Sequence, residues 1–144
     1  MREMAEQGIS FGAHTKSYPI LARESKKIID EEIREAKEAL ESKGIALSSV
    51  FAYPNGQPGD WNKDVEQVVA RTGFTSAVTT VEGANEKRTN VFAYRRNVMD
   101  ATSDDLSFAA IAAGVRSFLR AIKGYANWQQ VRPVVPLTLR STPQ

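Results

Sequence analysis

The chain has 144 residues, of which 42% are hydrophobic and 25% are charged, and its formal net charge is +2. This length and composition are typical of one globular domain with its own core, and the balanced charge argues against nucleic acid or an anionic membrane as a partner. The absence of cysteine excludes disulfides, thiolate nucleophiles and thiolate metal sites. No apolar run approaches the roughly 20 residues of a membrane span, and no signal region is visible, so no compartment is assigned.

The N-terminal part of the chain predicts a short buried strand that opens into a polar loop. Residues 1–7 resemble the last turns of an amphipathic helix, which Gly8 would end as a C-terminal cap. The mostly apolar residues 9–13 predict the strand. The following loop, residues 14–22, contains His14, the only histidine of the chain.

A long helix is predicted over residues 24–43. Its apolar positions recur at spacings of four, three and four residues and form one stripe, while charged residues fill the other faces. The stripe consists of Ile29, Ile33, Ala36 and Leu40. The charged faces predict a solvated outer surface of the helix.

The next segments alternate between strands and helices. Residues 48–53 are rich in β-forming side chains and predict a strand, and residues 54–59 are dense in turn residues and predict a loop. A helix is predicted over residues 62–72, with Asp60 as its candidate N-cap. Residues 74–81, rich in Thr and Val, predict another strand.

The C-terminal part predicts one more strand and one more helix. A polar loop over residues 82–89 leads into a strand over residues 90–98, and a helix follows over residues 103–124 with Ser103 as its N-cap. Residues 125–144 contain three prolines and predict an extended tail. The buried face of the last helix is predicted to consist of Phe108, Ile111, Val115, Phe118, Leu119 and Ile122.

The alternation of helices and strands predicts an α/β fold built from parallel units. The predicted strands are too few for a complete eight-stranded barrel, so they would form a partial (β/α) barrel or a small open sheet. The domain organisation that follows is an α/β domain over residues 1–124 and a Pro-containing C-terminal tail over residues 125–144.

Four segments, in order, resemble motifs of the polysaccharide deacetylases, the NodB-homology family or carbohydrate esterase family four. Residues 12–21, Gly-Ala-His-Thr-Lys-Ser-Tyr-Pro-Ile-Leu, resemble the metal-binding motif. Residues 50–56, Val-Phe-Ala-Tyr-Pro-Asn-Gly, are similar to the motif that follows it, and residues 73–80 and 94–96 to its continuation. The resemblance covers roughly residues 1–122.

The resemblance implies an irregular seven-stranded (β/α) barrel, of which this chain would form a part that lacks the first strands. It also implies hydrolysis of N- or O-acetyl groups on a sugar polymer. In the family a divalent metal, here expected to be zinc, is held by one Asp and two His, and a separate Asp acts as base. Such an ion activates water and polarises the acetyl carbonyl.

Carried over residue by residue, the resemblance implies one metal ligand and one oxyanion donor. His14 occupies the first histidine position of the metal motif, and Tyr18 occupies the second, although tyrosine is a poor ligand at neutral pH. Asn55 stands where the family has a Tyr whose backbone N–H stabilises the oxyanion, and a backbone donor survives a change of side chain. Ala52 stands where many members have Arg.

A substrate groove is predicted beside this site. Aromatic faces stack on pyranose rings, so Tyr53 and Trp61 are candidates for sugar contact together with Pro54 and Asn55. The alternative for the two aromatic residues is packing in the core. The alternative for His14 is a loop histidine that caps a strand end.

The chain also departs from the family pattern. The strand that ends in paired aspartates is not found before His14, and no second histidine is present. The chain is therefore predicted to be the C-terminal portion of a deacetylase-like domain, or a relative with impaired catalysis. The alternative is a non-catalytic module that binds carbohydrate or protein. An uncovered sheet edge would favour completion by a second copy of the chain.

Overall fold

The computed structural model describes residues 1–99 and 104–114. Its centre is a parallel three-stranded sheet formed by β1 (Phe11–Ala13), β2 (Leu47–Ala52) and β3 (Ser76–Val78), in the order β1-β2-β3. This confirms the α/β fold class. The described strands form an open sheet and not a closed barrel.

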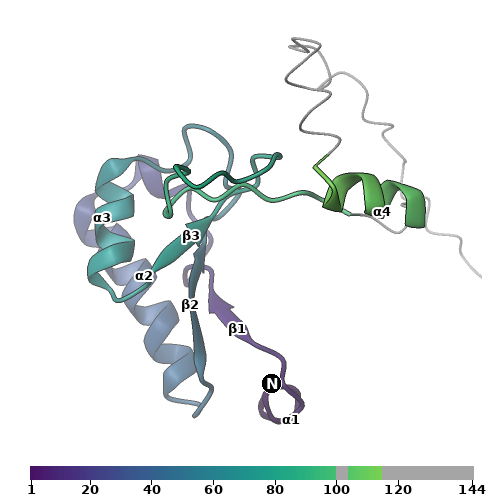
Figure 1. Ribbon diagram of the computed structural model, residues 1–144. Coiled ribbons are helices and arrows are strands. Elements are labelled where there is room, and N and C mark those ends of the chain that lie inside the picture. The colour runs from purple at the N-terminus through teal and green to yellow at the C-terminus, as the bar shows by residue number, and fades with distance from the viewer. Residues whose placement is uncertain (100–103, 115–144) are drawn as a thin grey trace, which may run out of the picture.

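Two helices connect the strands and lie on the same side of the sheet, as Figure 1 shows. They are α2 (Lys26–Glu41) and α3 (Lys63–Arg71), and both segments were predicted to be helical. The core lies between these helices and the sheet. Its buried members are Ala13, Leu21, Ile29, Ile33, Ala36, Phe51, Tyr53, Val65, Val68, Val69, Phe74 and Ala77.

The start of each long helix is set by a polar side chain. The Ser25 side chain accepts a hydrogen bond from the N–H of Ile28 at 3.4 Å and caps α2. Asn62 caps α3, because its side chain accepts from the N–H of Val65 at 3.1 Å. The prediction that Asp60 is the cap is therefore wrong. Its carboxylate is bound inside the preceding loop.

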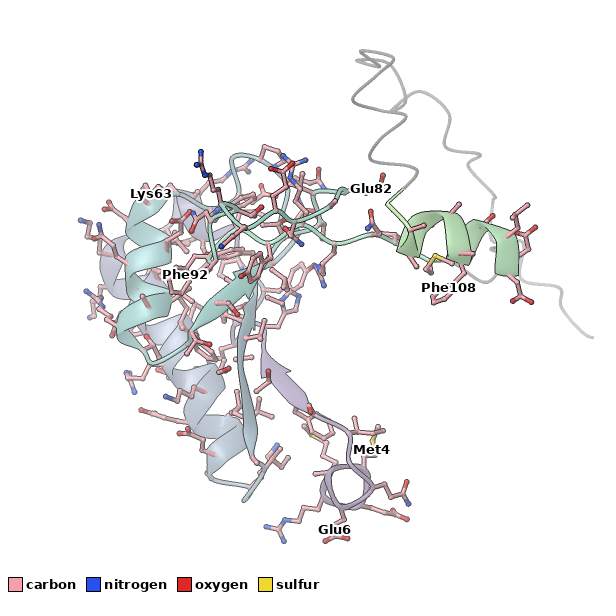
Figure 2. The ribbon with its side chains drawn as sticks, in the orientation of Figure 1. Met4, Glu6, Lys63, Glu82, Phe92 and Phe108 are labelled. Carbon is pink, nitrogen blue, oxygen red and sulfur yellow. The ribbon has the colours of Figure 1, made fainter. Side chains whose placement is uncertain are left out.

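The remaining helical elements are short. They are α1 (Arg2–Glu6), the single 3-10 turn η1 (Leu21–Arg23) and α4 (Asp105–Ala112). Figure 2 shows that α1, which carries Met4, and α4, which carries Phe108, stand apart from the sheet.

The start and the packing of α4 differ from the prediction. Asp104 caps α4 by accepting from the N–H of Ser107 at 2.8 Å, so the cap is not Ser103, which lies outside the described residues. Phe108 was predicted to be buried, but it is 60% exposed. The predicted buried residues Val115, Phe118, Leu119 and Ile122 lie outside the described residues.

The prediction of a strand over residues 90–98 is wrong. Asn90 folds the segment into a turn, because its side-chain oxygen accepts from the N–H of Phe92 at 3.0 Å and its carbonyl accepts from the N–H of Ala93 at 2.9 Å. The segment still lies beside β3, where Tyr94 forms a single parallel bridge with Val78. The β-forming side chains of this segment gave it the appearance of a strand.

The predicted boundary between residues 1–124 and residues 125–144 lies outside the described residues and stays a prediction. Among residues 1–99 and 104–114, none of the helices has the length and apolarity that a membrane crossing needs.

The packing of α2 leads to a prediction about stability. Ile33 is fully buried and Ile28, on the same helix, is 40% exposed. We expect Ile33→Ala to lower the free energy of unfolding by about 2–5 kcal/mol, because it leaves a cavity in the core. Urea denaturation followed by circular dichroism measures this loss. Ile28→Ala is the matched control and should change the value by less than about 0.5 kcal/mol. Equal losses in the two variants would contradict the packing described.

Candidate functional site

The candidate site lies at the edge of the sheet where all three strands end. Because the strands are parallel, their carboxyl ends meet at one edge, where α/β proteins commonly bind ligands. His14 directly follows β1, Tyr53 follows β2 and Thr79 follows β3. The segments after β1 and β2 thereby meet at the exposed side chain of His14, and the segment after β3 contacts the one after β2.

His14 is held in one orientation by the main chain of the neighbouring strand. Its Nδ1 lies 2.7 Å from the carbonyl oxygen of Ala52, at the end of β2. A carbonyl can only accept, so Nδ1 carries the hydrogen and donates it, which leaves the lone pair on Nε2. No partner for Nε2 is found within the described residues. This is the arrangement that metal-binding histidines adopt, since a hydrogen bond at one nitrogen orients the other toward the ion.

Tyr18 and Asn55 lie beside His14. The N–H of Asn55 donates to the hydroxyl oxygen of Tyr18 at 3.2 Å. The rings of Tyr18 and His14 pack edge to face, with centroids 5.0 Å apart and an interplanar angle of 77°. The structure thus brings together three of the residues that the sequence predicted for this site.

The backbone around the site is strained at three residues. Thr15, Tyr18 and Asn55 have φ angles of 62°, 65° and 55°, and they are the only residues other than glycine with positive φ in the described parts of the chain. For Thr15 and Tyr18 this conformation costs roughly 1–3 kcal/mol and is kept only where the surroundings hold it, whereas asparagine tolerates it at less cost. Strain of this kind concentrates at functional sites.

Glu32 holds the His14 loop against α2. Its carboxylate accepts from the N–H of Lys16 at 2.9 Å, and from the N–H and hydroxyl of Ser17 at 2.8 and 2.6 Å. Partial burial of Glu32 opposes its ionisation, but these hydrogen bonds outweigh it and keep the pKa of the carboxyl below its usual value. A second bond from the same helix joins Glu35 to Lys16 at 2.7 Å. The sequence did not reveal this role, because Glu32 belongs to a run of charged residues expected to face solvent.

A second set of hydrogen bonds holds Asn55. Its side-chain N–H donates to the nearly buried carboxylate of Asp60 at 2.6 Å, and its carbonyl accepts from the hydroxyl of Thr80 at 2.6 Å. Asp60 also accepts from the N–H of Gln57 at 2.8 Å. The turn needs glycine at position 56, since φ of Gly56 is 68° and a Cβ there would lie 2.9 Å from the backbone nitrogen of Thr80. The direction of the Asn55 N–H is thereby fixed from several sides.

The other predicted groove residues lie deeper. Tyr53 is 1% exposed and donates its hydroxyl hydrogen to the carbonyl of Phe92 at 2.9 Å, and burial raises the pKa of this phenol strongly. Trp61 is half-buried and stacks on Tyr53, with centroids 5.3 Å apart and an interplanar angle of 12°. Pro54 is also buried. Of the four residues, Asn55 is exposed and Trp61 partly exposed, while the other two support them from the core.

Whether these residues could hold a metal ion depends on which ligand side chains lie close together. His14 has the orientation of a ligand, but the described residues contain no group of three His, Cys, Asp or Glu that could hold an ion together. Residues 1–99 and 104–114 thus fit one ligand position of a metal site and do not supply a complete one.

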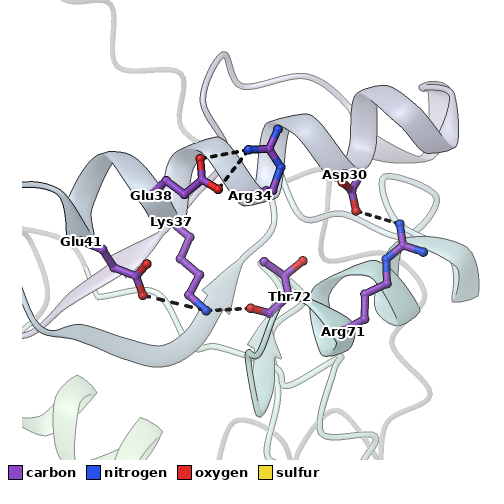
Figure 3. A pocket seen from close by; sticks show the side chains of 7 residues that line it. All are labelled: Asp30, Arg34, Lys37, Glu38, Glu41, Arg71 and Thr72. Carbon is purple, nitrogen blue, oxygen red and sulfur yellow. Dashed lines mark hydrogen bonds and ion pairs between the residues drawn. The ribbon is translucent and has the colours of Figure 1, made fainter.

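A separate hollow lies on the outer side of the molecule, between α2 and the end of α3 (Figure 3). It has a volume of about 450 Å³. Its charged groups are satisfied by one another, as in the pairs of Arg71 with Asp30 at 2.8 Å and Arg34 with Glu38 at 2.9 Å. Its lining consists of Asp30, Arg34, Lys37, Glu38, Glu41, Arg71 and Thr72, and includes none of the residues around His14.

Comparison with known proteins agrees with the motifs. The model of the polysaccharide deacetylase family matches residues 1–77. The chain is 26% identical over 96 residues to YxkH of Bacillus subtilis (strain 168), whose name assigns it to the polysaccharide deacetylases. That alignment covers 67% of this chain and 33% of the relative.

The structure is similar to that of the Streptococcus pyogenes deacetylase PplD in complex with acetate. The TM-score is 0.70 and the sequence identity 25%, over 77% of this chain and 48% of that one. The chain therefore spans between a third and a half of the length of these two relatives.

The orientation of His14 predicts its tautomer. Because Nδ1 donates to the Ala52 carbonyl, the neutral ring should carry its hydrogen on Nδ1, which is the less common form in solution. Long-range ¹H–¹⁵N NMR at pH 8 distinguishes the tautomers, and the single histidine removes any ambiguity of assignment. Hydrogen on Nε2 would contradict the hydrogen bond described.

The lowered pKa of Glu32 predicts a pH dependence of stability. The stabilisation of the fold by the Glu32 carboxylate should be fully present above the ordinary glutamate pKa of 4.5. It should be lost as the pH falls through the lower pKa that Glu32 has in the folded protein. We expect Glu32→Gln to destabilise the protein at pH 6 and to differ less from wild type near pH 3. Urea denaturation at the two pH values measures the difference. The control Glu41→Gln removes a carboxylate at the exposed end of α2 that binds no part of the His14 loop, so it should destabilise the protein less than Glu32→Gln does at pH 6.

Proposed function

The chain belongs to the polysaccharide deacetylase family, and we propose that it takes part in the metal-dependent removal of acetyl groups from a sugar polymer. The observation that supports this most directly is the orientation of His14, whose Nδ1 is bound by the Ala52 carbonyl so that Nε2 can bind an ion. The chain spans only part of the length of its relatives, so we also propose, and do not take as given, that it has the activity of a whole deacetylase.

We assign separate tasks to the residues of the site. His14 would be one ligand of a divalent ion, with zinc expected because imidazole suits it. Bound there, the ion would supply an activated water and polarise the acyl oxygen. Asn55, with its N–H held at the edge of the site, would belong to the part that receives the acyl group, and Trp61 would contact the sugar.

The incomplete set of ligands bears on activity. One imidazole does not hold a catalytic ion, so we propose that this form is impaired or is completed by another polypeptide segment. The sheet would then be part of an irregular (β/α) barrel. Within the described residues no strand pairs with the outer edge of β1, which makes this edge a candidate for pairing with a second copy. Size-exclusion chromatography with light scattering tests that pairing, and a monomer would contradict it.

The second candidate function is non-catalytic binding of carbohydrate or protein. The same incomplete ligand set favours it, because the exposed Asn55 and the half-buried Trp61 need no ion to contact a sugar. Binding of an acetylated oligosaccharide that is unchanged by removal of divalent ions would support this function over the first.

Zinc binding tests the metal proposal. We expect calorimetry to show micromolar zinc binding that His14→Ala abolishes. Tyr18→His should bind zinc at least about tenfold more tightly, because it supplies a second imidazole four residues after the first. Arg23→His is the matched control, since it adds a histidine away from this loop motif and should leave the affinity unchanged. Absence of zinc binding in the wild-type protein would contradict a residual metal site.

A further inference from the structure

Tyr18 is exposed and yet held in place. Its φ of 65° is unfavourable for a bulky side chain, and 57% of its surface is exposed. Even so, its N–H donates to the hydroxyl of Thr15 at 3.2 Å, and its ring packs on His14. Glu32 binds the two residues that precede it. An exposed aromatic residue kept in a strained conformation by several contacts is a candidate for a functional role.

The direction of one hydrogen bond defines what the Tyr18 hydroxyl can do. The N–H of Asn55 donates, so the phenol oxygen accepts, and its own hydrogen remains available. Within the described residues this hydrogen has no acceptor. Accepting a hydrogen bond also polarises a hydroxyl and makes it a stronger donor. Asn55 and Tyr18 together thus form a short chain of hydrogen bonds that ends beside His14 in an O–H with no acceptor among residues 1–99 and 104–114.

We propose that the Tyr18 hydroxyl is the group that donates a hydrogen bond to the acyl oxygen of the ligand, with the Asn55 N–H behind it. This rests on the proposed function for the class of ligand, an acetyl group or the acetate released from it. The role differs from that of a metal ligand, which the position of Tyr18 in the motif had suggested. It also differs from direct donation by Asn55, because the N–H of Asn55 is already occupied.

The competing role for Tyr18 is obstruction. In that case the phenol would merely cover the Asn55 N–H, and a ligand would have to displace it. The two roles predict opposite effects of removing the hydroxyl. Loss of a donor weakens ligand binding, whereas loss of an obstruction strengthens it or leaves it unchanged.

The experiment is a titration of the metal-free protein with sodium acetate, followed by ¹H–¹⁵N NMR. We compare wild type with Tyr18→Phe, which keeps the ring and its packing on His14. Tyr94→Phe is the matched control, because it removes a phenol hydroxyl that makes no hydrogen bond within the described residues. Sodium chloride at equal concentration controls for ionic strength. For wild type we expect a saturable shift of the Asn55 amide, and for Tyr18→Phe a loss of about tenfold in acetate affinity. Tyr94→Phe should bind as wild type does.

Two results would overturn the proposal. One is equal or tighter acetate binding by Tyr18→Phe, which would identify Tyr18 as an obstruction. The other is the absence of a saturable shift at Asn55 in the wild-type protein up to about 50 mM acetate. Because the titration contains no metal, its failure is distinguishable from failure of the zinc experiment, which tests the proposed function itself.

Discussion

The parallel pairing of β2 with both of its neighbours is the constraint on which the site depends. Parallel strands end at one edge, so the loops after β1, β2 and β3 must lie together although they are distant in sequence. The bond from His14 to the Ala52 carbonyl crosses from the first strand to the second. The bond from Thr80 to the Asn55 carbonyl joins the third to the second. Each loop is thereby positioned by its neighbour and not by its own sequence alone.

The elements that were predicted correctly can be recognised from residues that are close together in the sequence. The apolar stripe of α2 was visible from the spacing of Ile29, Ile33 and Ala36, and all three are buried. The position of His14 after a short strand, at the start of a turn-rich loop, was visible in the same way. The resemblance to the family, now shown by comparison, rested on short motifs of this kind.

What was missed depends on contacts between distant residues. Glu32 binds Ser17 fifteen residues away, and nothing in a helix rich in charge distinguishes it from its neighbours. For Tyr53 the sequence left open sugar contact and packing in the core; it is 1% exposed and stacks on Trp61, an arrangement that depends on residues brought together by the fold. The segment after Asn90 has strand-forming residues, but the Asn90 side-chain oxygen accepts a hydrogen bond from the N–H of Phe92, and this bond turns the backbone. A local sequence pattern does not show which of several possible contacts a side chain makes in the folded protein.

The acceptor that orients His14 is a main-chain oxygen, and this affects how the site can evolve. A substitution at position 52 changes the side chain but keeps the carbonyl, provided that β2 stays in register. Natural variation at that position is therefore compatible with an unchanged imidazole. Sequence drift at position 52 among descendants of this chain would be no sign that His14 has lost its orientation, whereas an insertion that shifted β2 would remove that orientation at once.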